Sequence, residues 1–106
     1  MLLVYLSIYP MYANVVEVAN FHQLQKEEPP YAKWGRLAMK ATKARYPNAD
    51  IVDYLHIGAD KENGTTTEKF KLWLRAPERE FGVFIDIRFH TATEEIIEMT
   101  FRETDR

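Results

Sequence analysis

Basic and aromatic side chains alternate along two segments of this 106-residue chain, and together they could form a binding surface. In residues 66–75 and 81–89, apolar residues at every second position indicate β-strands with one buried face. The opposite face would carry Lys71, Trp73, Arg75, Phe84, Arg88 and His90. Exposed aromatic residues beside arginine are typical of the energetically important positions of protein interfaces. We therefore predict a protein-binding surface; the alternatives are an ordinary solvated face, or aromatic rings covered by the N-terminal segment.

A second set of basic residues recurs along one side of a predicted helix. Lys33, Arg36, Lys40 and Lys43 are three or four residues apart, and residues 31–46 contain no acidic residue. Helical spacing places these side chains on one face. Such a face could bind an anionic envelope polymer, phospholipid headgroups or an acidic protein. The alternative is that it is the solvated side of a helix packed on a sheet.

Residue types that would indicate catalysis or metal binding are scarce. His22, His56 and His90 show none of the spacings of a metal site, and a zinc site needs at least three converging ligands. The chain has no cysteine, so it has no disulfide, no thiol nucleophile and no thiolate ligand for zinc. We predict a protein that is not an enzyme, with no catalytic residues, no metal and no cofactor.

Composition limits the chain to one small domain with a sizeable core. Of its residues, 46% are hydrophobic and 13% aromatic, which is too apolar for a disordered chain. The formal net charge is −2, with 14 basic and 16 acidic residues. Nucleic-acid-binding domains are normally strongly basic, so we expect no nucleic acid among the partners.

Two prolines bracket the predicted helix. Pro30 suits the first turn of a helix, and Pro47 cannot continue one. The apolar residues between them recur at helical spacing and form one stripe: Trp34, Leu37, Ala38 and Ala41. Gly35 costs about 1 kcal/mol relative to alanine inside a helix, so we expect another element to pack closely against it.

Strands are expected over residues 51–57, 66–75, 81–89 and 96–101. A polar loop over residues 58–64 would end in Asn63-Gly64, a dipeptide typical of tight turns. The pattern in the first strand leaves open which side is buried. One side would carry Val52, Tyr54 and His56, and the other Ile51, Asp53, Leu55 and Ile57.

The two middle strands can be paired so that all their inward residues meet. Three cross-strand pairs define this register: Leu74–Phe81, Lys69–Asp86 and Trp73–Gly82. Opposite charges across strands stabilise a sheet, and a slip of one residue would expose the whole inward set. We predict an α+β domain, with one amphipathic helix packed on a four-stranded antiparallel meander.

The N-terminal residues are typical of a targeting signal. Residues 1–16 contain no charge, and the apolar run that begins at Leu2 is too short to span a bilayer. We expect a signal-peptide-like segment over residues 1–19, a linker over residues 20–30 and a single domain over residues 31–104. The alternative is that residues 2–9 form a buried strand. No transmembrane span is expected.

Several segments together carry a resemblance to a known family. The run from Tyr31 to Lys40 and the segments Tyr46–Ala49, Ile51–Leu55 and Thr67–Arg75 resemble the YqzG/YhdC family. These are small proteins of unknown function from Bacillus-type bacteria, generally with a signal peptide. The resemblance covers about residues 30–103 and implies secretion, but it brings no assigned site residues.

A looser similarity concerns the order of elements. A helix, then Tyr46-Pro47 and Ala49, then three strands and Thr93 with Ile96 is similar to PepSY-type domains, a PepSY-like or cystatin-like arrangement. Those modules are extracytoplasmic and are thought to restrain peptidases. A function drawn from this pattern is an analogy.

We therefore expect a small secreted or cell-envelope protein that binds a protein or an anionic envelope polymer. The alternative is a small envelope enzyme, or an enzyme accessory subunit, with a pocket between the helix and the sheet. The predicted binding residues are Lys71, Trp73, Arg75, Phe84, Arg88, Lys33, Arg36 and Lys40.

Overall fold

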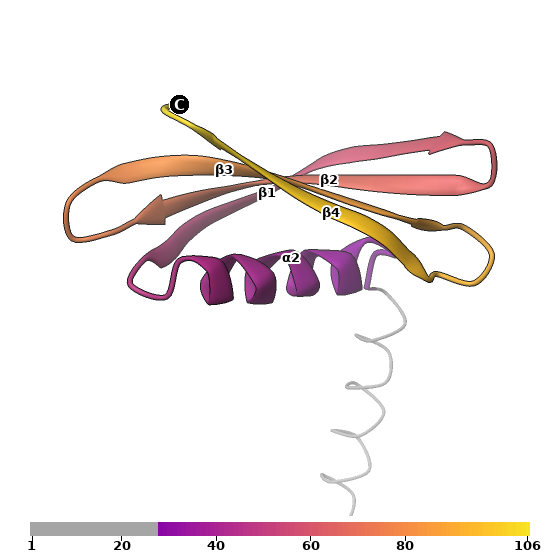
Figure 1. Cartoon of the computed structure of the whole chain (residues 1–106), viewed down its shortest axis with the longest axis horizontal. Helices are drawn as coiled ribbons and strands as arrows, with labels where there is room; N and C mark the ends of the chain where they lie inside the picture. The colour runs from indigo at the N-terminus through magenta and orange to yellow at the C-terminus, as the bar shows by residue number, and fades with distance from the viewer. Residues whose placement is uncertain (1–27) are drawn as a thin grey trace, which may run out of the picture. The chain divides into compact units, whose positions relative to one another are not determined.

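A computed structural model describes residues 28–106 of the chain. The expected signal-peptide-like segment and most of the expected linker lie outside these residues. In chain order the elements are α2 (Ala32–Arg45), β1 (Asp50–Glu62), β2 (Thr65–Arg75), β3 (Glu80–His90) and β4 (Ile96–Thr104). The strands form one antiparallel sheet in the order β1-β2-β3-β4, and α2 lies along one face (Figure 1). The predicted α+β architecture is confirmed.

Helix α2 begins and ends close to the predicted positions. Tyr31 is the N-cap residue, and the backbone N–H of Tyr46 donates to the carbonyl oxygen of Thr42 just before Pro47. Lys43 and Arg45 lie in the last turn, where positive charge favours the helix dipole. The buried residues of the helix are Trp34, Gly35, Ala38 and Thr42. Leu37 and Ala41, expected in the buried stripe, are only half-buried.

Gly35 is packed tightly against the sheet, as expected from its cost inside a helix. A Cβ atom at this position would lie 2.1 Å from the hydroxyl oxygen of Tyr54, which comes from β1. A side chain at this position would force Tyr54 to move. The glycine therefore lets α2 approach the sheet closely at the place where the Tyr54 side chain lies against the helix.

The core lies between α2 and the inward residues of β2 and β3. The Trp34 ring stacks on Phe89 with 4.0 Å between ring centroids, and Phe70, Leu72 and Ile85 are completely buried. The predicted pairing of the two middle strands is confirmed at all three positions: Leu74–Phe81, Lys69–Asp86 and Trp73–Gly82.

The predicted loop over residues 58–64 is wrong, because most of it belongs to β1. This strand continues to Glu62 and pairs with β2 as far as Thr65, so that only Asn63 and Gly64 form the turn. Both turn residues have positive φ, at 51° and 81°, as a two-residue hairpin turn requires. The polar composition of residues 58–62 reflects an exposed edge strand, which does not need buried side chains.

Two β-bulges in β1 explain why its buried side could not be predicted from alternation. One lies between Ile51 and Asp53 and the other between His56 and Gly58. Each bulge adds one residue and so shifts the phase of the strand. As a result Ile51, Tyr54 and His56 all pair with inward residues of β2. Neither of the two predicted sets is therefore buried as a unit.

The last strand is longer than predicted, running from Ile96 to Thr104 where residues 96–101 were expected. Its extension adds Arg102, directly opposite Phe84 of β3. A register shift next to Phe89 accommodates the adjacent pair Ile96 and Ile97. The predicted end was too early because Arg102, Glu103 and Thr104 are all polar and do not continue the apolar alternation, which stops at Phe101.

Candidate functional site

The sheet has one face covered by α2 and one face turned away from it, which we call the outer face. The five predicted sheet residues, Lys71, Trp73, Arg75, Phe84 and Arg88, lie together on the outer face, because they pair in the register opposite to the buried positions. His90 ends β3 as an exposed residue. The stretch of alternating residues in β2 and β3 is thus the reason that these side chains share a surface.

At the middle of the outer face two cations flank an aromatic ring. Lys71 of β2 and Arg102 of β4 are the direct cross-strand neighbours of Phe84. The Lys71 Nζ lies 5.5 Å from the centroid of the Phe84 ring, and the Arg102 guanidinium lies 4.4 Å from it. The same Nζ is 6.0 Å from the ring of Trp73. We call Lys71, Trp73, Phe84 and Arg102 the central cluster.

The other predicted basic residues of this face are paired with acids. Arg75 Nε donates to Glu80 Oε2 at 3.1 Å, and the indole N–H of Trp73 donates to the other oxygen of Glu80 at 2.9 Å. The bond from Trp73 and the contact with Arg75 lower the pKa of Glu80 below its ordinary value. Arg88 lies 3.6 Å from a carboxylate oxygen of Glu98. Arg75 and Arg88 therefore lie next to the central cluster, and each is already paired with a carboxylate.

An apolar margin borders the cluster along β1. Val52, Leu55 and Ile57, which we call the apolar margin, are exposed by 40%, 56% and 49%. Val52 and Ile57 are the extra residues at the two bulges. A shallow hollow of about 200 Å³ is lined by Leu55 and Asp53 of β1 and by Lys71 and Trp73 of β2. Exposed apolar surface beside cations is suited to contact with another polypeptide.

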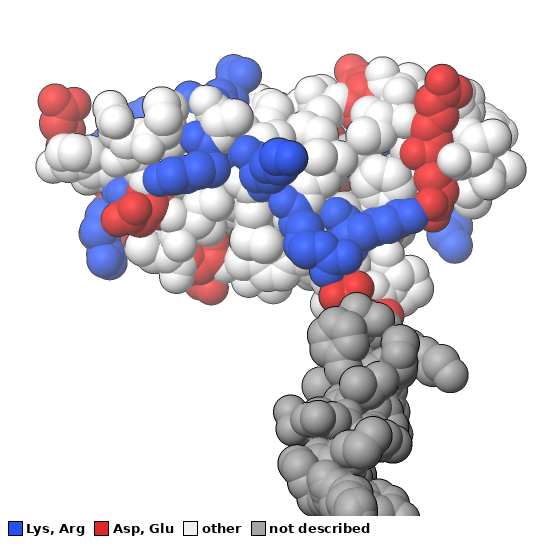
Figure 2. Space-filling view, turned by 90° about the horizontal axis from the view of Figure 1, so that it is seen from below, with Lys and Arg blue, Asp and Glu red and all other residues white. Residues whose placement is uncertain are grey.

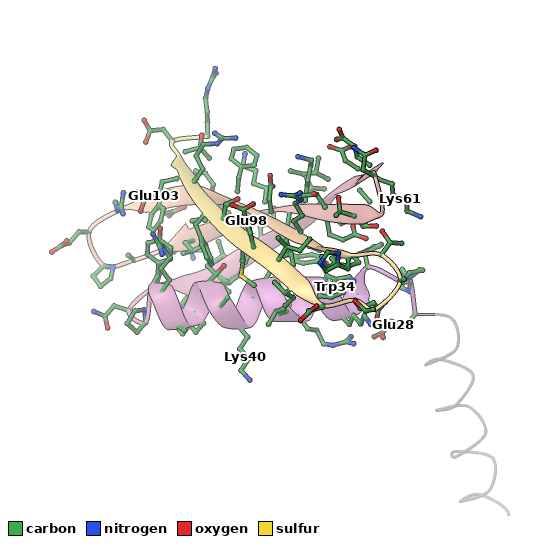
Figure 3. All side chains as sticks on the ribbon, turned by 45° about the vertical axis from the view of Figure 1, so that its right-hand side comes forward. Glu28, Trp34, Lys40, Lys61, Glu98 and Glu103 are labelled. Carbon is green, nitrogen blue, oxygen red and sulfur yellow. The ribbon has the colours of Figure 1, made fainter. Side chains whose placement is uncertain are left out.

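The predicted basic residues of α2 form a separate surface on the other side of the domain. Seen from the side of α2, Lys and Arg gather in a band (Figure 2). Lys33 pairs with Glu94, and Lys43 lies 3.9 Å from Asp50. Lys40 is exposed and points away from the sheet, whereas Trp34 lies between the helix and the sheet (Figure 3). The eight predicted binding residues, including Arg36, thus belong to two surfaces separated by the core.

A polar pair that was not predicted from the sequence, His56 and Glu68, lies on the face of the sheet that α2 covers. His56 Nε2 and Glu68 Oε1 are 2.7 Å apart, and the Tyr31 ring stacks on the imidazole with 3.7 Å between centroids. The pKa of nearby Tyr54 is raised above its ordinary value. The main cause is burial of the phenol, and the phenol of Tyr31 and the carboxylate of Glu68 add to it. Phe70 also lies against the imidazole, at 5.2 Å. The pair fills the margin of the core beneath α2 and is not part of the outer face.

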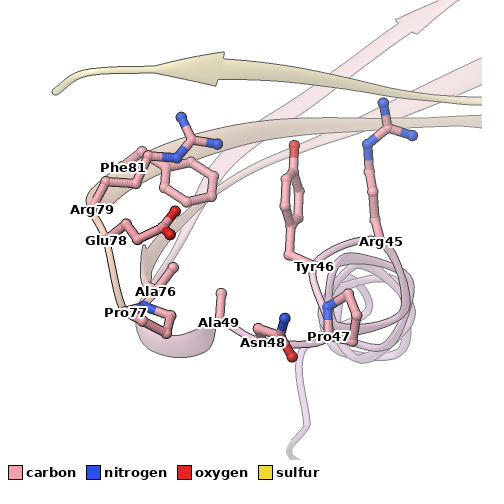
Figure 4. Close-up of a pocket in the computed structure, with 10 residues that line it drawn as sticks. All are labelled: Arg45, Tyr46, Pro47, Asn48, Ala49, Ala76, Pro77, Glu78, Arg79 and Phe81. Atoms are coloured by element: carbon pink, nitrogen blue, oxygen red, sulfur yellow. The ribbon is translucent and has the colours of Figure 1, made fainter.

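A cavity of about 350 Å³ lies beyond the C-terminal end of α2 (Figure 4). The helix end and the turn into β1 line one side of it, and the turn between β2 and β3 lines the other. Arg79 stacks on Phe81 at 3.8 Å and donates to Glu103, which also accepts a hydrogen bond of 2.8 Å from the Tyr46 hydroxyl. The bonds from Arg79 and Tyr46 lower the pKa of Glu103. The pKa of Tyr46 is raised, mainly by burial and then by its bond to Glu103.

Comparison with known proteins identifies relatives but no activity. A family model described as "Protein of unknown function (DUF3889)" matches residues 11–103. The chain belongs to the DUF3889 family. This DUF3889 protein is also similar to an uncharacterized protein, YqzG, of Bacillus subtilis (strain 168), with 29% identity over 72 residues. The match covers 68% of this chain and 67% of the relative, and it agrees with the predicted resemblance. No solved structure gives a significant match.

Residues 28–106 of this DUF3889 protein contain no group of three or more His, Asp or Glu side chains arranged to hold a metal ion. In the same residues, no helix has the length and hydrophobicity needed to cross a membrane.

Proposed function

We propose that this DUF3889 protein acts by binding another protein through the outer face of its sheet. The supporting observation is the central cluster, in which two half-buried aromatic rings stay accessible beside the apolar margin, Phe84 between two cations and Trp73 next to Lys71. Trp and Arg are enriched among the residues that dominate binding energy, and aromatic residues combine a large contact area with low entropic cost.

The proposed place of action is the cell envelope or the medium. The uncharged, largely apolar residues 1–16 support export, as does the resemblance to a family whose members generally carry a signal peptide. Intact-mass measurement of the protein in medium and in cells tests this. A species in the medium that begins near Asn14 or Asn20 is expected, and an uncleaved chain confined to the cytosol would contradict it. A finer proposal, drawn from the PepSY-like order of elements, is that the partner is a peptidase.

The binding proposal is tested by a matched pair of variants. Partners are first cross-linked to the wild-type protein on producing cells, and the affinity of each purified partner is then measured. Trp73→Ala should weaken binding at least tenfold, about 1.4 kcal/mol, because hot-spot residues cost more than this on truncation. Leu37→Ala removes a half-buried side chain from α2, on the other side of the domain, and should leave the affinity unchanged.

The folded state of both variants is followed by thermal unfolding. Trp73→Ala should keep a cooperative transition near that of the wild type, because its side chain lies on the outer face and not in the core. A Trp73→Ala chain that unfolds would show that Trp73 is structural, and unchanged affinity in a folded variant would remove the outer face as the binding surface.

A second candidate function is contact of the basic side of α2 with an anionic envelope polymer or membrane. It is favoured by the exposed position of Lys40, which points away from the sheet (Figure 3). Binding to phosphatidylglycerol vesicles should fall with increasing salt and fall further in Lys40→Glu. Binding that is insensitive to salt would count against this surface.

The alternative of an enzyme or accessory subunit would use the cavity at the end of α2, which lies between the helix end and the sheet (Figure 4). Chemical-shift changes confined to Tyr46 and Phe81 on addition of a small-molecule library would favour it over a protein-binding role.

A further inference from the structure

We infer that the central cluster recognises a carboxylate of an acidic, partly apolar segment of the partner protein. This inference rests on the proposed function and specifies the chemistry of the bound surface. Its centre is Phe84, with Lys71 on one neighbouring strand and Arg102 on the other.

The distribution of ion pairs singles out these two cations. Lys69 lies within 3.5 Å of both Asp60 and Asp86. The remaining cations of β2 and β3 on this face are also paired, Arg75 with Glu80 and Arg88 with Glu98. Within residues 28–106, Lys71 and Arg102 have contacts with aromatic rings but no ion pair with a carboxylate. Lys71 and Arg102 at the centre are therefore the strand cations of the outer face that have no carboxylate partner, within the part of the chain that the structure describes.

The aromatic ring between the two cations keeps them in place. A cation over the face of an aromatic ring is held by the ring quadrupole, so Lys71 and Arg102 are oriented along Phe84 before any partner arrives. A carboxylate placed above the edge of the ring could accept hydrogen bonds from both side chains. Hydrogen bonds between ionised groups are about twice as strong as those between neutral groups.

The surroundings favour a polypeptide over a polyanion. Beside Lys71 lies the hollow lined by Trp73 and Leu55, which offers apolar contact that a phosphate polymer cannot use. Asp53, at the rim of the hollow, is engaged by the backbone N–H of Tyr54 at 2.8 Å and would repel a continuous row of negative charge. On the face that meets the sheet, the expected segment thus alternates a carboxylate with an apolar side chain, which are two residues apart if the segment is extended.

The experiment uses the full chain and defined peptides. The probe is a synthetic peptide that repeats Glu-Glu-Leu-Ser, which in an extended form alternates Glu and Leu on one face. The matched peptide repeats Gln-Gln-Leu-Ser, and sodium polyphosphate serves as the polyanion. Binding is measured by titration calorimetry with the wild type, with Lys71→Gln/Arg102→Gln, and with Lys69→Gln/Arg88→Gln. The last variant also removes two positive charges from the outer face, but these charges already have acidic partners.

We expect the Glu peptide to bind the wild type at least tenfold more tightly than the Gln peptide. Lys71→Gln/Arg102→Gln should abolish that preference, and Lys69→Gln/Arg88→Gln should retain it. Equal binding of the two peptides, equal losses in the two variants, or no binding of the Glu peptide would each overturn the inference. Tight binding of polyphosphate with the same dependence on Lys71 and Arg102 would replace the acidic segment by a phosphate polymer, and so would also overturn it.

The failure of this inference is distinguishable from the failure of the proposed function. If Trp73→Ala weakens the natural partner but Lys71→Gln/Arg102→Gln does not, the outer face still binds protein and only the carboxylate is wrong. If neither variant weakens the natural partner, the outer face is not the binding surface.

Discussion

Replacing Gly35 by alanine tests how closely α2 lies on the sheet. In an open helical position this change would stabilise the protein by about 1 kcal/mol through helix propensity. Here the new Cβ would lie 2.1 Å from the Tyr54 hydroxyl oxygen and 3.0 Å from the ring carbon that carries it. Forcing an extra carbon into a packed site typically costs about 1–3 kcal/mol. We therefore expect Gly35→Ala to destabilise the protein, by up to about 2 kcal/mol net.

Tyr54→Phe separates the two contributions, because it removes the hydroxyl that the new carbon would meet first. In the Tyr54→Phe background, the same Gly35→Ala change should be close to neutral or stabilising. The coupling between the two positions should reach about 1 kcal/mol or more, which is typical of residues in contact. Ala44→Gly, at an exposed position of the same helix, gives the propensity effect without any such contact.

Urea unfolding of the four chains of this cycle gives the coupling free energy. The midpoints are compared only where the dependence of the free energy on urea is unchanged, because a change in slope reports a different unfolded or native state. If Gly35→Ala stabilises both backgrounds equally, Tyr54 does not lie against Gly35, and the argument for this glycine fails.

Two further predictions concern single groups. The Thr42 hydroxyl oxygen is fully buried and has no hydrogen-bond partner among residues 28–106, so Thr42→Val should stabilise the protein by about 1 kcal/mol in urea unfolding; a loss of stability would contradict this. The pKa of Glu103 is lowered by Arg79 and Tyr46, so its contribution to stability is present above the ordinary value of 4.5 and lost as the pH falls through the lowered one. Glu103→Gln should therefore be less stable than the wild type at neutral pH and approach it in acid, and a gap that does not narrow would argue against these bonds.

The sequence sufficed for the middle of the sheet, because β2 and β3 both alternate without interruption. One register buries every inward apolar residue of the two strands and also pairs Lys69 with Asp86, whereas a slip of one residue would expose that whole inward set. The outer-face positions of Lys71, Trp73 and Phe84 follow from this register. That part of the candidate site is therefore predictable from the amino-acid pattern alone.

The edge strands could not be read in the same way. Bulges next to Ile51 and His56 change which side of β1 is buried, and a bulge has no reliable mark in a single sequence. The pair of His56 with Glu68 depends on that change of phase, and so it was missed. Arg102 was missed because it follows Phe101, the last apolar residue of the alternation, and the strand then continues through polar residues only.

The same two bulges also bear on the solubility of the protein at high concentration. An edge strand with free N–H and C=O groups and exposed Val52, Leu55 and Ile57 would ordinarily be a template on which further chains could stack into aggregates. A bulge interrupts the even spacing of the backbone groups and increases the local twist, so a flat strand of a second molecule cannot pair along the full length of β1. The apolar residues at this edge can then remain exposed for a specific partner without making the strand prone to aggregation.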